Sequence, residues 1–161
     1  MASDDQLLFA LTLVAALGCG LMAGLFFAFS VSVMKALARL PSAEGIAAMQ
    51  SINVAIINPV FLAAFFGTAV ACVLVMIASF LRWHDFGAVY LLIGGALYLV
   101  GTFLVTLVFN VPKNNVLASV APANPESASL WTDYLSKWTA WNHIRAAAAL
   151  AAATSLTIAL C

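Results

Sequence analysis

The chain has 161 residues, of which 65% are hydrophobic and only 7% are charged, and its mean hydropathy is +1.11. About a quarter of the residues of a soluble domain are charged, so this composition excludes an ordinary soluble domain. It predicts one integral membrane domain over residues 1–161. Six basic residues balance six acidic ones and form no basic run, so we expect no nucleic-acid partner.

Four apolar runs are long enough to cross a bilayer, which takes about 20 residues. They cover about residues 7–37, 59–81, 86–109 and 138–160. The third run is expected to end before Pro112, because a proline disfavours helix at the residue that precedes it. The sequence therefore predicts an all-α fold, a multi-pass bundle of four transmembrane helices.

Three connections join these runs. Residues 39–57 begin with Pro41-Ser42, a helix-start signal, and then carry isoleucine and methionine at near-helical spacing, which predicts a short interfacial helix. Residues 82–85 form a tight turn, and residues 112–137 form the longest polar connection. In the first apolar run, Gly20-x-x-x-Gly24 is typical of a packing face between membrane helices, either within the bundle or in a homo-oligomer.

Basic residues near the helix ends predict the orientation, since cytoplasmic loops are enriched in them. The first and third connections contain Lys35, Arg39, Lys113 and Lys137, whereas the second contains Arg82. We therefore expect both termini on the non-cytoplasmic side. The two long connections then share the cytoplasmic side, whose surroundings include the membrane lipids.

Strong polar side chains occur inside the fourth apolar run. Trp138, then Trp141 or Asn142, then Arg145 recur at helical spacing and lie on one stripe. His143 is about 100° around the helix from Asn142, an angle at which it can still point into the bundle. Polar groups in hydrocarbon are costly unless paired, so they predict a functional site. The alternative is a snorkelling Arg145 within an aromatic belt at the membrane interface.

Further polar residues reach the same side of the membrane from other segments. Asn110 and Asn114 flank Pro112, and they either cap the end of the third helix or orient a ligand. Gln50 and Asn53 come from the first connection, which must lie on the same side as the third. We expect these four side chains to bind the substrate.

Metal and cofactor chemistry finds little support in the residue pattern. His143 is the one good metal ligand on that side, and His84 belongs to the opposite side. Cys19, Cys72 and Cys161 lie in or at the end of apolar runs without a CxxC spacing. We expect no metal site and no cofactor, although His143 as a single axial haem ligand stays an open alternative.

One combination of polar and aromatic residues extends over the third and fourth runs: Asn110-x-Pro112-x-Asn114, then Trp138-x-x-Trp141-Asn142-His143-x-Arg145. It resembles the anthrone oxygenase-like family of small four-helix membrane proteins. The resemblance implies a membrane oxidoreductase, a monooxygenase that oxidises a lipophilic aromatic or enolisable substrate with molecular oxygen and without a bound cofactor.

The resemblance also suggests roles for the residues. His143 would be the general base, Arg145 and Asn142 would stabilise an oxyanion, and Trp138 and Trp141 would stack on the substrate rings. Two other functions stay open, a non-catalytic carrier of a small hydrophobic or anionic ligand and an accessory subunit. Oxygen-dependent product formation distinguishes the enzyme from both.

Overall fold

The computed structural model describes residues 2–161, which form helices and, in that range, no strand. The first helix comprises α1 (Ala2–Ala28), the π-helical turn η1 (Phe29–Val33) and α2 (Met34–Leu37). α3 (Ser42–Ala55) and α4 (Pro59–Leu81) follow. The next long helix, here called the third helix, comprises α5 (Ala88–Ala96), the π-helical segments η2 (Leu97–Leu104) and η3 (Thr106–Asn110), and α6 (Val111–Ala118). The last element is α7 (Ser127–Ile158).

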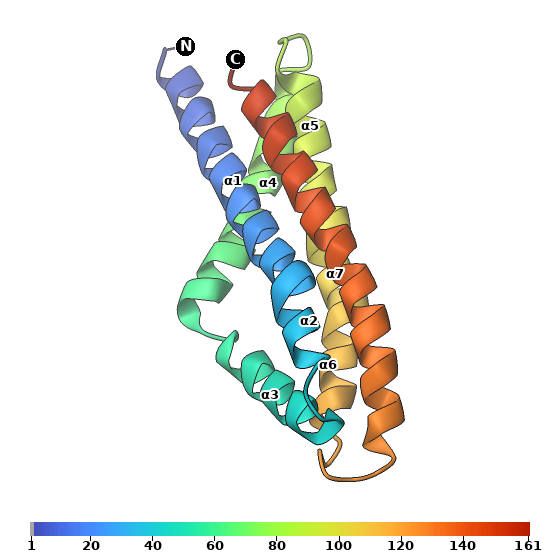
Figure 1. Cartoon of the computed structure of the whole chain (residues 1–161). Helices are drawn as coiled ribbons and strands as arrows, with labels where there is room; N and C mark the ends of the chain where they lie inside the picture. The colour runs from blue at the N-terminus through green and yellow to red at the C-terminus, as the bar shows by residue number, and fades with distance from the viewer. Residues whose placement is uncertain (1) are drawn as a thin grey trace.

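The long helices pack side by side, and α3 lies across one end of them (Figure 1). α7 packs along α1 and along the third helix, and α4 packs on α1 and α5. Both termini and the turn after α4 are at one end, whereas α3 and the turn between α6 and α7 are at the other. The expected convergence of the first and third connections at one end is therefore present in the fold.

Three helical spans are long and apolar enough to cross a membrane by length and composition, namely Ser3–Leu37, Pro59–Leu81 and Ala88–Ala118. α7 is not among them. Its first half is polar, and its apolar half contains Asn142, His143 and Arg145. These three spans indicate that the chain is a membrane protein, and the fourth crossing stays a prediction.

The predicted limits are confirmed for α4, where Asn58 accepts a hydrogen bond from the Phe61 amide (3.0 Å) and Pro59 occupies the first turn. The predicted end of the first helix at Leu37 is also confirmed, but this helix begins at Ala2 rather than at residue 7. The helix predicted from Pro41-Ser42 is α3. Two further limits are wrong. The third helix continues past Pro112 to Ala118, and α7 begins at residue 127 rather than 138. The predicted 112–137 connection is therefore mostly helix, and only residues 119–126 join the two helices.

The π-helical segments of the third helix explain how it passes Pro112. A proline lacks an amide N–H and its ring crowds the preceding turn, and local π turns in membrane helices relieve both problems. These turns also take up more residues than the 3.6 of an α-helix. As a result, Thr102, Thr106, Asn110 and Asn114, spaced four apart, all form hydrogen bonds with α7.

The core has two parts. The larger cluster fills the space between α1, α4, the third helix and α7 and includes Tyr98, whose hydroxyl donates to the Phe65 carbonyl (3.0 Å). The smaller cluster lies at the α3 end and includes Met49, Tyr134 and Trp138. Close helix contact occurs at the glycines of the third helix, where a Cβ on Gly101 would lie 2.4 Å from the Ala148 Cβ.

The Gly20-x-x-x-Gly24 pair does not pack against another described helix. A Cβ added at Gly20 or Gly24 would meet no atom within 4 Å. This pair therefore lies on an open face of α1, and its use as a packing face inside the bundle was predicted wrongly. Its use between copies of the chain stays a prediction.

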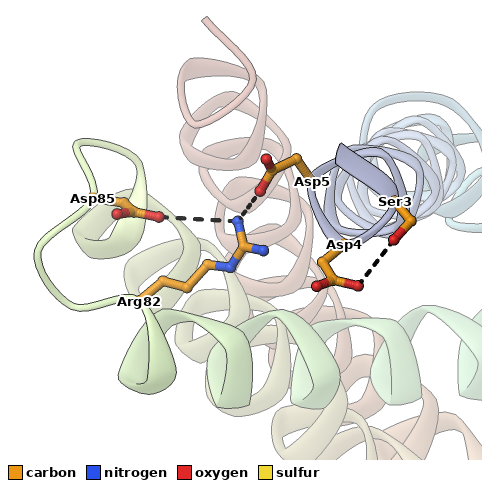
Figure 2. A network of polar contacts seen from close by, with 5 residues as sticks. All are labelled: Ser3, Asp4, Asp5, Arg82 and Asp85. Atoms are coloured by element: carbon orange, nitrogen blue, oxygen red, sulfur yellow. Dashed lines mark hydrogen bonds and ion pairs between the residues drawn. The ribbon is translucent and has the colours of Figure 1, made fainter. Parts of the chain in front are cut away.

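An ion pair fixes the start of α1 to the turn after α4 (Figure 2). Arg82 donates to Asp5 at 2.5 Å and lies 4.0 Å from Asp85, while Ser3 donates to Asp4. These side chains are partly or fully exposed, and such pairs contribute little to stability. The network marks the end of the bundle opposite α3.

Candidate functional site

A cavity of about 230 Å³ lies where the two core clusters meet, and we call it the Arg145 cavity. Its walls come from α1 with η1, α3, α4, η3 with α6, and α7. The lining side chains are Leu25, Phe26, Phe29, Met49, Ile52, Asn53, Ile56, Ile57, Phe61, Leu62, Phe65, Phe66, Thr106, Leu107, Val111, Asn114, Trp138 and Arg145. A mostly apolar pocket with a few polar groups is the usual form of a small-molecule site.

Arg145 is the charged residue of this lining and is only 4% exposed. Its guanidinium lies 4.2 Å from the centre of the Phe26 ring and 5.2 Å from that of Trp138. One terminal nitrogen donates to Thr106 Oγ1 (3.1 Å) and the other to Asn142 Oδ1 (2.5 Å). The alternative of a snorkelling Arg145 therefore does not hold, because this side chain is held inside the bundle.

No carboxylate among residues 2–161 forms an ion pair with Arg145. The ion pairs in this range join Arg82 to Asp5 and Asp85, and Asp133 to Lys113 and Lys137. A buried cation without a counter-ion carries a desolvation cost. Hydrogen bonds from neutral groups and the faces of two aromatic rings offset only part of it.

Asn142 orients Arg145 and does not line the cavity. It is fully buried, and its Nδ2 donates to the Phe26 carbonyl (2.7 Å) and to Ser30 Oγ (2.6 Å). Its Oδ1 accepts from Arg145. The side-chain amide is therefore engaged on both sides with protein groups, and the expected direct contact of Asn142 with an oxyanion is not supported by this geometry.

Asn114 connects α6 to the aromatic side chains of α7. Its Oδ1 accepts from the Tyr134 hydroxyl and from Trp138 Nε1, both at 2.8 Å. Burial raises the pKa of Tyr134, so its phenol stays protonated at neutral pH and remains a donor. Because two donors occupy Oδ1, the amide Nδ2 of Asn114 is the group left for a ligand.

Several N–H groups of the lining residues have no partner in the described part of the chain. They are Asn114 Nδ2, which donates no hydrogen bond there, and Asn53 Nδ2 and Arg145 Nε, which are buried without one. Buried polar groups are nearly always hydrogen-bonded in native proteins. Two buried donors without partners, Asn53 Nδ2 and Arg145 Nε, together with Asn114 Nδ2 of a half-buried side chain, indicate a ligand that carries acceptor oxygens.

Two predicted site residues lie elsewhere. His143 is exposed and lines an outer groove of α1 and α7 together with Gly20 and Gly24. It does not point into the bundle, because the helical stripe that faces inward contains Asn142, one residue before it, and Arg145, two residues after it. Trp141 stacks on Phe109 with ring centres 3.7 Å apart and does not line the Arg145 cavity.

Two other predicted residues connect secondary-structure elements rather than line the cavity. Gln50 of α3 donates to the Leu117 and Val120 carbonyls (2.8 and 3.0 Å), so it satisfies the free end of α6. Asn110 donates to the Trp138 carbonyl (3.2 Å) and its Oδ1 is buried without a partner. Of the predicted substrate-binding residues, the structure places Asn53, Asn114 and Trp138 at the cavity with Arg145.

Sequence reasoning missed Phe26, Thr106 and the phenylalanines of α4. Phe61 and Phe65 stack with ring centres 5.7 Å apart, and Phe65 stacks on Phe103 at 5.3 Å. Phenylalanine inside an apolar run carries no signal that separates a ligand wall from ordinary core. For Thr106 a signal did exist, namely the four-residue repeat from Thr102 to Asn114.

Exposed apolar side chains border the cavity on one side. Ile57, Phe66 and Leu107 all line it, yet they are 69%, 47% and 43% exposed. They belong to the segment before α4, to α4 and to η3. The cavity therefore opens over an apolar rim, which suits the entry of a lipophilic molecule.

Among residues 2–161, no group of three or more His, Cys, Asp or Glu side chains is placed to hold a metal ion. Cys19 and Cys72 lie together in the core, with their sulfurs 3.9 Å apart, and Cys161 is exposed at the end of the chain. His143, the expected candidate for a haem ligand, faces the outer groove and not the Arg145 cavity.

The comparison with known families agrees with this site. A family model described as anthrone oxygenase matches residues 60–155, which is more than half of the chain. The matched segment contains nearly all of α4, the whole third helix and most of α7, and with them Asn114, Trp138 and Arg145. No curated protein and no solved structure matches the chain. The chain belongs to the anthrone oxygenase family.

Proposed function

We propose that this protein is a membrane oxygenase that oxidises a flat, lipophilic aromatic ketone of the anthrone type with molecular oxygen in the Arg145 cavity. The observation that carries the proposal is the combination found there. An aromatic and aliphatic wall faces a buried guanidinium and amide N–H groups without partners. Family membership supplies the reaction class, and the cavity supplies a place for such a molecule.

The proposed arrangement in the membrane has four crossings. α7 packs along α1 and the third helix over most of its length, so a bilayer that surrounds those helices also surrounds α7. Basic residues are concentrated at the α3 end, where Lys35, Arg39, Lys113 and Lys137 lie, whereas the other end contains Arg82. By the positive-inside rule the α3 end, and with it the site, faces the cytoplasm and both termini face away from it.

The proposed substrate lies with its rings against Phe61, Phe65 and Trp138 and with its oxygen toward Arg145. Stacking and edge contacts of aromatic rings favour a flat polycyclic ligand. Arg145 Nε, Asn53 Nδ2 and Asn114 Nδ2 are the donors available to the ligand oxygen. These groups stabilise the negative charge on that oxygen of the deprotonated substrate, as donors of an oxyanion hole do.

The overall reaction balances with dioxygen as the only other reactant. Anthrone (C14H10O) and O2 give anthraquinone (C14H8O2) and H2O. The methylene group loses a proton, and the carbanion reduces O2 as a C–O bond forms to give a peroxide anion. A proton from water converts this anion to the hydroperoxide, and loss of water across the O–O bond leaves the new carbonyl. One oxygen atom enters the product and the other leaves in water, and the reaction written in this way needs no resident cofactor.

The alternative function is a carrier that binds the same class of molecule without changing it. A buried Arg145 without a counter-ion suits a binding protein as well as an enzyme. Oxygen consumption therefore distinguishes the carrier from the oxygenase. An accessory subunit would neither consume oxygen nor retain the ligand.

The test uses the full chain in phosphatidylcholine nanodiscs with anthrone in an oxygen electrode. We expect oxygen uptake well above that of empty nanodiscs, with one O2 consumed and one anthraquinone formed per anthrone. A control with the protein and anthraquinone in place of anthrone should consume no oxygen. Uptake equal to that of the empty nanodiscs, together with saturable binding of anthrone, would contradict catalysis and favour the carrier.

A further inference from the structure

The Arg145 cavity has an unbalanced positive charge. The residues of α1 and η1 that line it are Leu25, Phe26 and Phe29, and those of α4 are Leu62 and three phenylalanines, none of which is charged. The residue of η3 that accepts a hydrogen bond from Arg145 is Thr106, which is neutral. On α7 the titratable group that interacts with Arg145 is Tyr134, a phenol whose pKa is raised by burial. Asp133 pairs with Lys137 (2.6 Å) and Lys113 (3.9 Å), so that carboxylate is neutralised by those cations.

The cavity also lacks a base. None of its lining side chains is a carboxylate, an imidazole, an amine or a thiol. The Tyr134 hydroxyl donates its proton to Asn114, and the His143 imidazole faces the outer groove. A proton on a bound neutral ligand therefore has no side chain in the cavity to receive it, whereas a ligand that arrives ionised meets a guanidinium in a medium where the attraction is strong.

We propose that the cavity binds its ligand as a preformed oxyanion, the enolate, phenolate or carboxylate of a flat lipophilic molecule, with Arg145 as its counter-ion. The ligand loses its proton in water or at the membrane surface before it binds. The protein then contributes the electrostatic environment and the apolar wall rather than proton abstraction. The proposal rests on the proposed function for the class of substrate, but its test requires no turnover.

The test compares two ligands of similar shape, one negatively charged and the other neutral. Anthracene-9-carboxylate is ionised at neutral pH, and 9-anthracenemethanol is neutral. Both are titrated into the full chain in phosphatidylcholine nanodiscs, with tryptophan fluorescence as the readout. Since a hydrogen bond to a charged group is worth about 1.5–3 kcal/mol, or about tenfold or more in affinity, we expect the carboxylate to bind at least about tenfold more tightly.

Three variants locate the effect. In Arg145→Met the two ligands should bind equally, and in Arg145→Lys the preference should be reduced but present, since lysine is a point charge without the planar fork. Lys113→Met removes a cation from the surface of α6, outside the cavity, and should keep the wild-type preference. Equal binding of both ligands by the wild type, or loss of the preference in Lys113→Met, would overturn the proposal.

Two further arms make the result unambiguous. A lipid phosphate offers the same charge, so the titration is repeated in nanodiscs that contain phosphatidylglycerol. Unchanged carboxylate affinity supports a substrate site, and displacement by the lipid would overturn it in favour of a headgroup site.

The second additional experiment measures the binding of anthrone under nitrogen as a function of pH. The affinity should rise about tenfold per pH unit below the pKa of anthrone itself, whereas pH-independent binding would show that the neutral form binds and would overturn the proposal.

The outcomes are separable from those of the proposed function. A carboxylate preference without oxygen uptake would contradict the proposed oxygenase function and support the anion site. Oxygen uptake without a carboxylate preference would support the oxygenase function and contradict the anion site.

Discussion

Replacing Arg145 by methionine is expected to lower kcat/KM for anthrone oxidation by a factor of about 10² to 10³. The guanidinium is the one cation of the cavity and sits beside the wall where the substrate oxygen is proposed to lie. Methionine is unbranched and apolar, and it replaces the stem of the arginine while removing the guanidinium that lies between Phe26 and Trp138. Oxygen uptake in nanodiscs, compared at equal protein content, measures the effect.

The same variant separates function from folding. Replacing buried charged groups with apolar side chains of similar volume is often neutral or stabilising, so we expect the melting temperature of Arg145→Met to equal or exceed that of the wild type. Arg145→Lys should show intermediate activity, because it keeps the charge without the planar fork. Activity above a tenth of the wild-type value in Arg145→Met would show that this guanidinium is not part of the reaction.

Replacing Asn142 by leucine is expected to lower the free energy of unfolding by about 3 kcal/mol. The two hydrogen bonds from Nδ2 to α1 and η1 are between neutral groups, and each contributes about 0.6 kcal/mol on average between membrane helices. The third bond accepts from the Arg145 cation and is worth about 1.5–3 kcal/mol. Thermal or denaturant unfolding in detergent measures the loss.

The matched control for Asn142→Leu is Thr154→Val on the same helix. Thr154 is exposed, and its hydroxyl donates to the Leu150 carbonyl of its own helix at 3.0 Å. Its replacement removes a hydrogen bond without separating helices, so stability should be unchanged within error. If Asn142→Leu unfolds like this control, Asn142 does not hold α7 against α1.

Asn142→Leu also reports on the positioning of Arg145. The leucine removes the acceptor that fixes one terminal nitrogen of the guanidinium. At a temperature where the variant is folded, we expect a weaker preference for anthracene-9-carboxylate over 9-anthracenemethanol. A purely structural role would leave that preference unchanged.

The helices were largely predictable from the sequence, because apolar length decides them in a membrane protein. The end of the third helix, beyond Pro112, and the start of α7, before residue 138, were not predictable. Pro112 is accommodated by the π turns of η3, which no local pattern announces. The polar composition at the start of α7 favours a loop, although Trp131, Tyr134 and Trp138 repeat at helical spacing and are buried on one face.

The site was predictable in part. Arg145 inside an apolar run is unusual enough to mark the place, and Asn53, Asn114 and Trp138 do line the cavity with it. The sequence could not distinguish Trp141 from Asn142, which are adjacent and fit the stripe equally. It also could not fix the rotation of α7, and this rotation decides that Asn142 and Arg145 face inward while His143 and Trp141 do not line the cavity.

The most direct test of the proposed function is anthrone-dependent oxygen uptake by His143→Ala. The reaction is proposed to occur in the Arg145 cavity, and His143 lies in the outer groove with Gly20 and Gly24. We therefore expect a rate equal to that of the wild type. A loss as large as that of Arg145→Met, with unchanged melting temperature, would mean that the imidazole takes part in the reaction and that the cavity assigned here is not where the chemistry occurs.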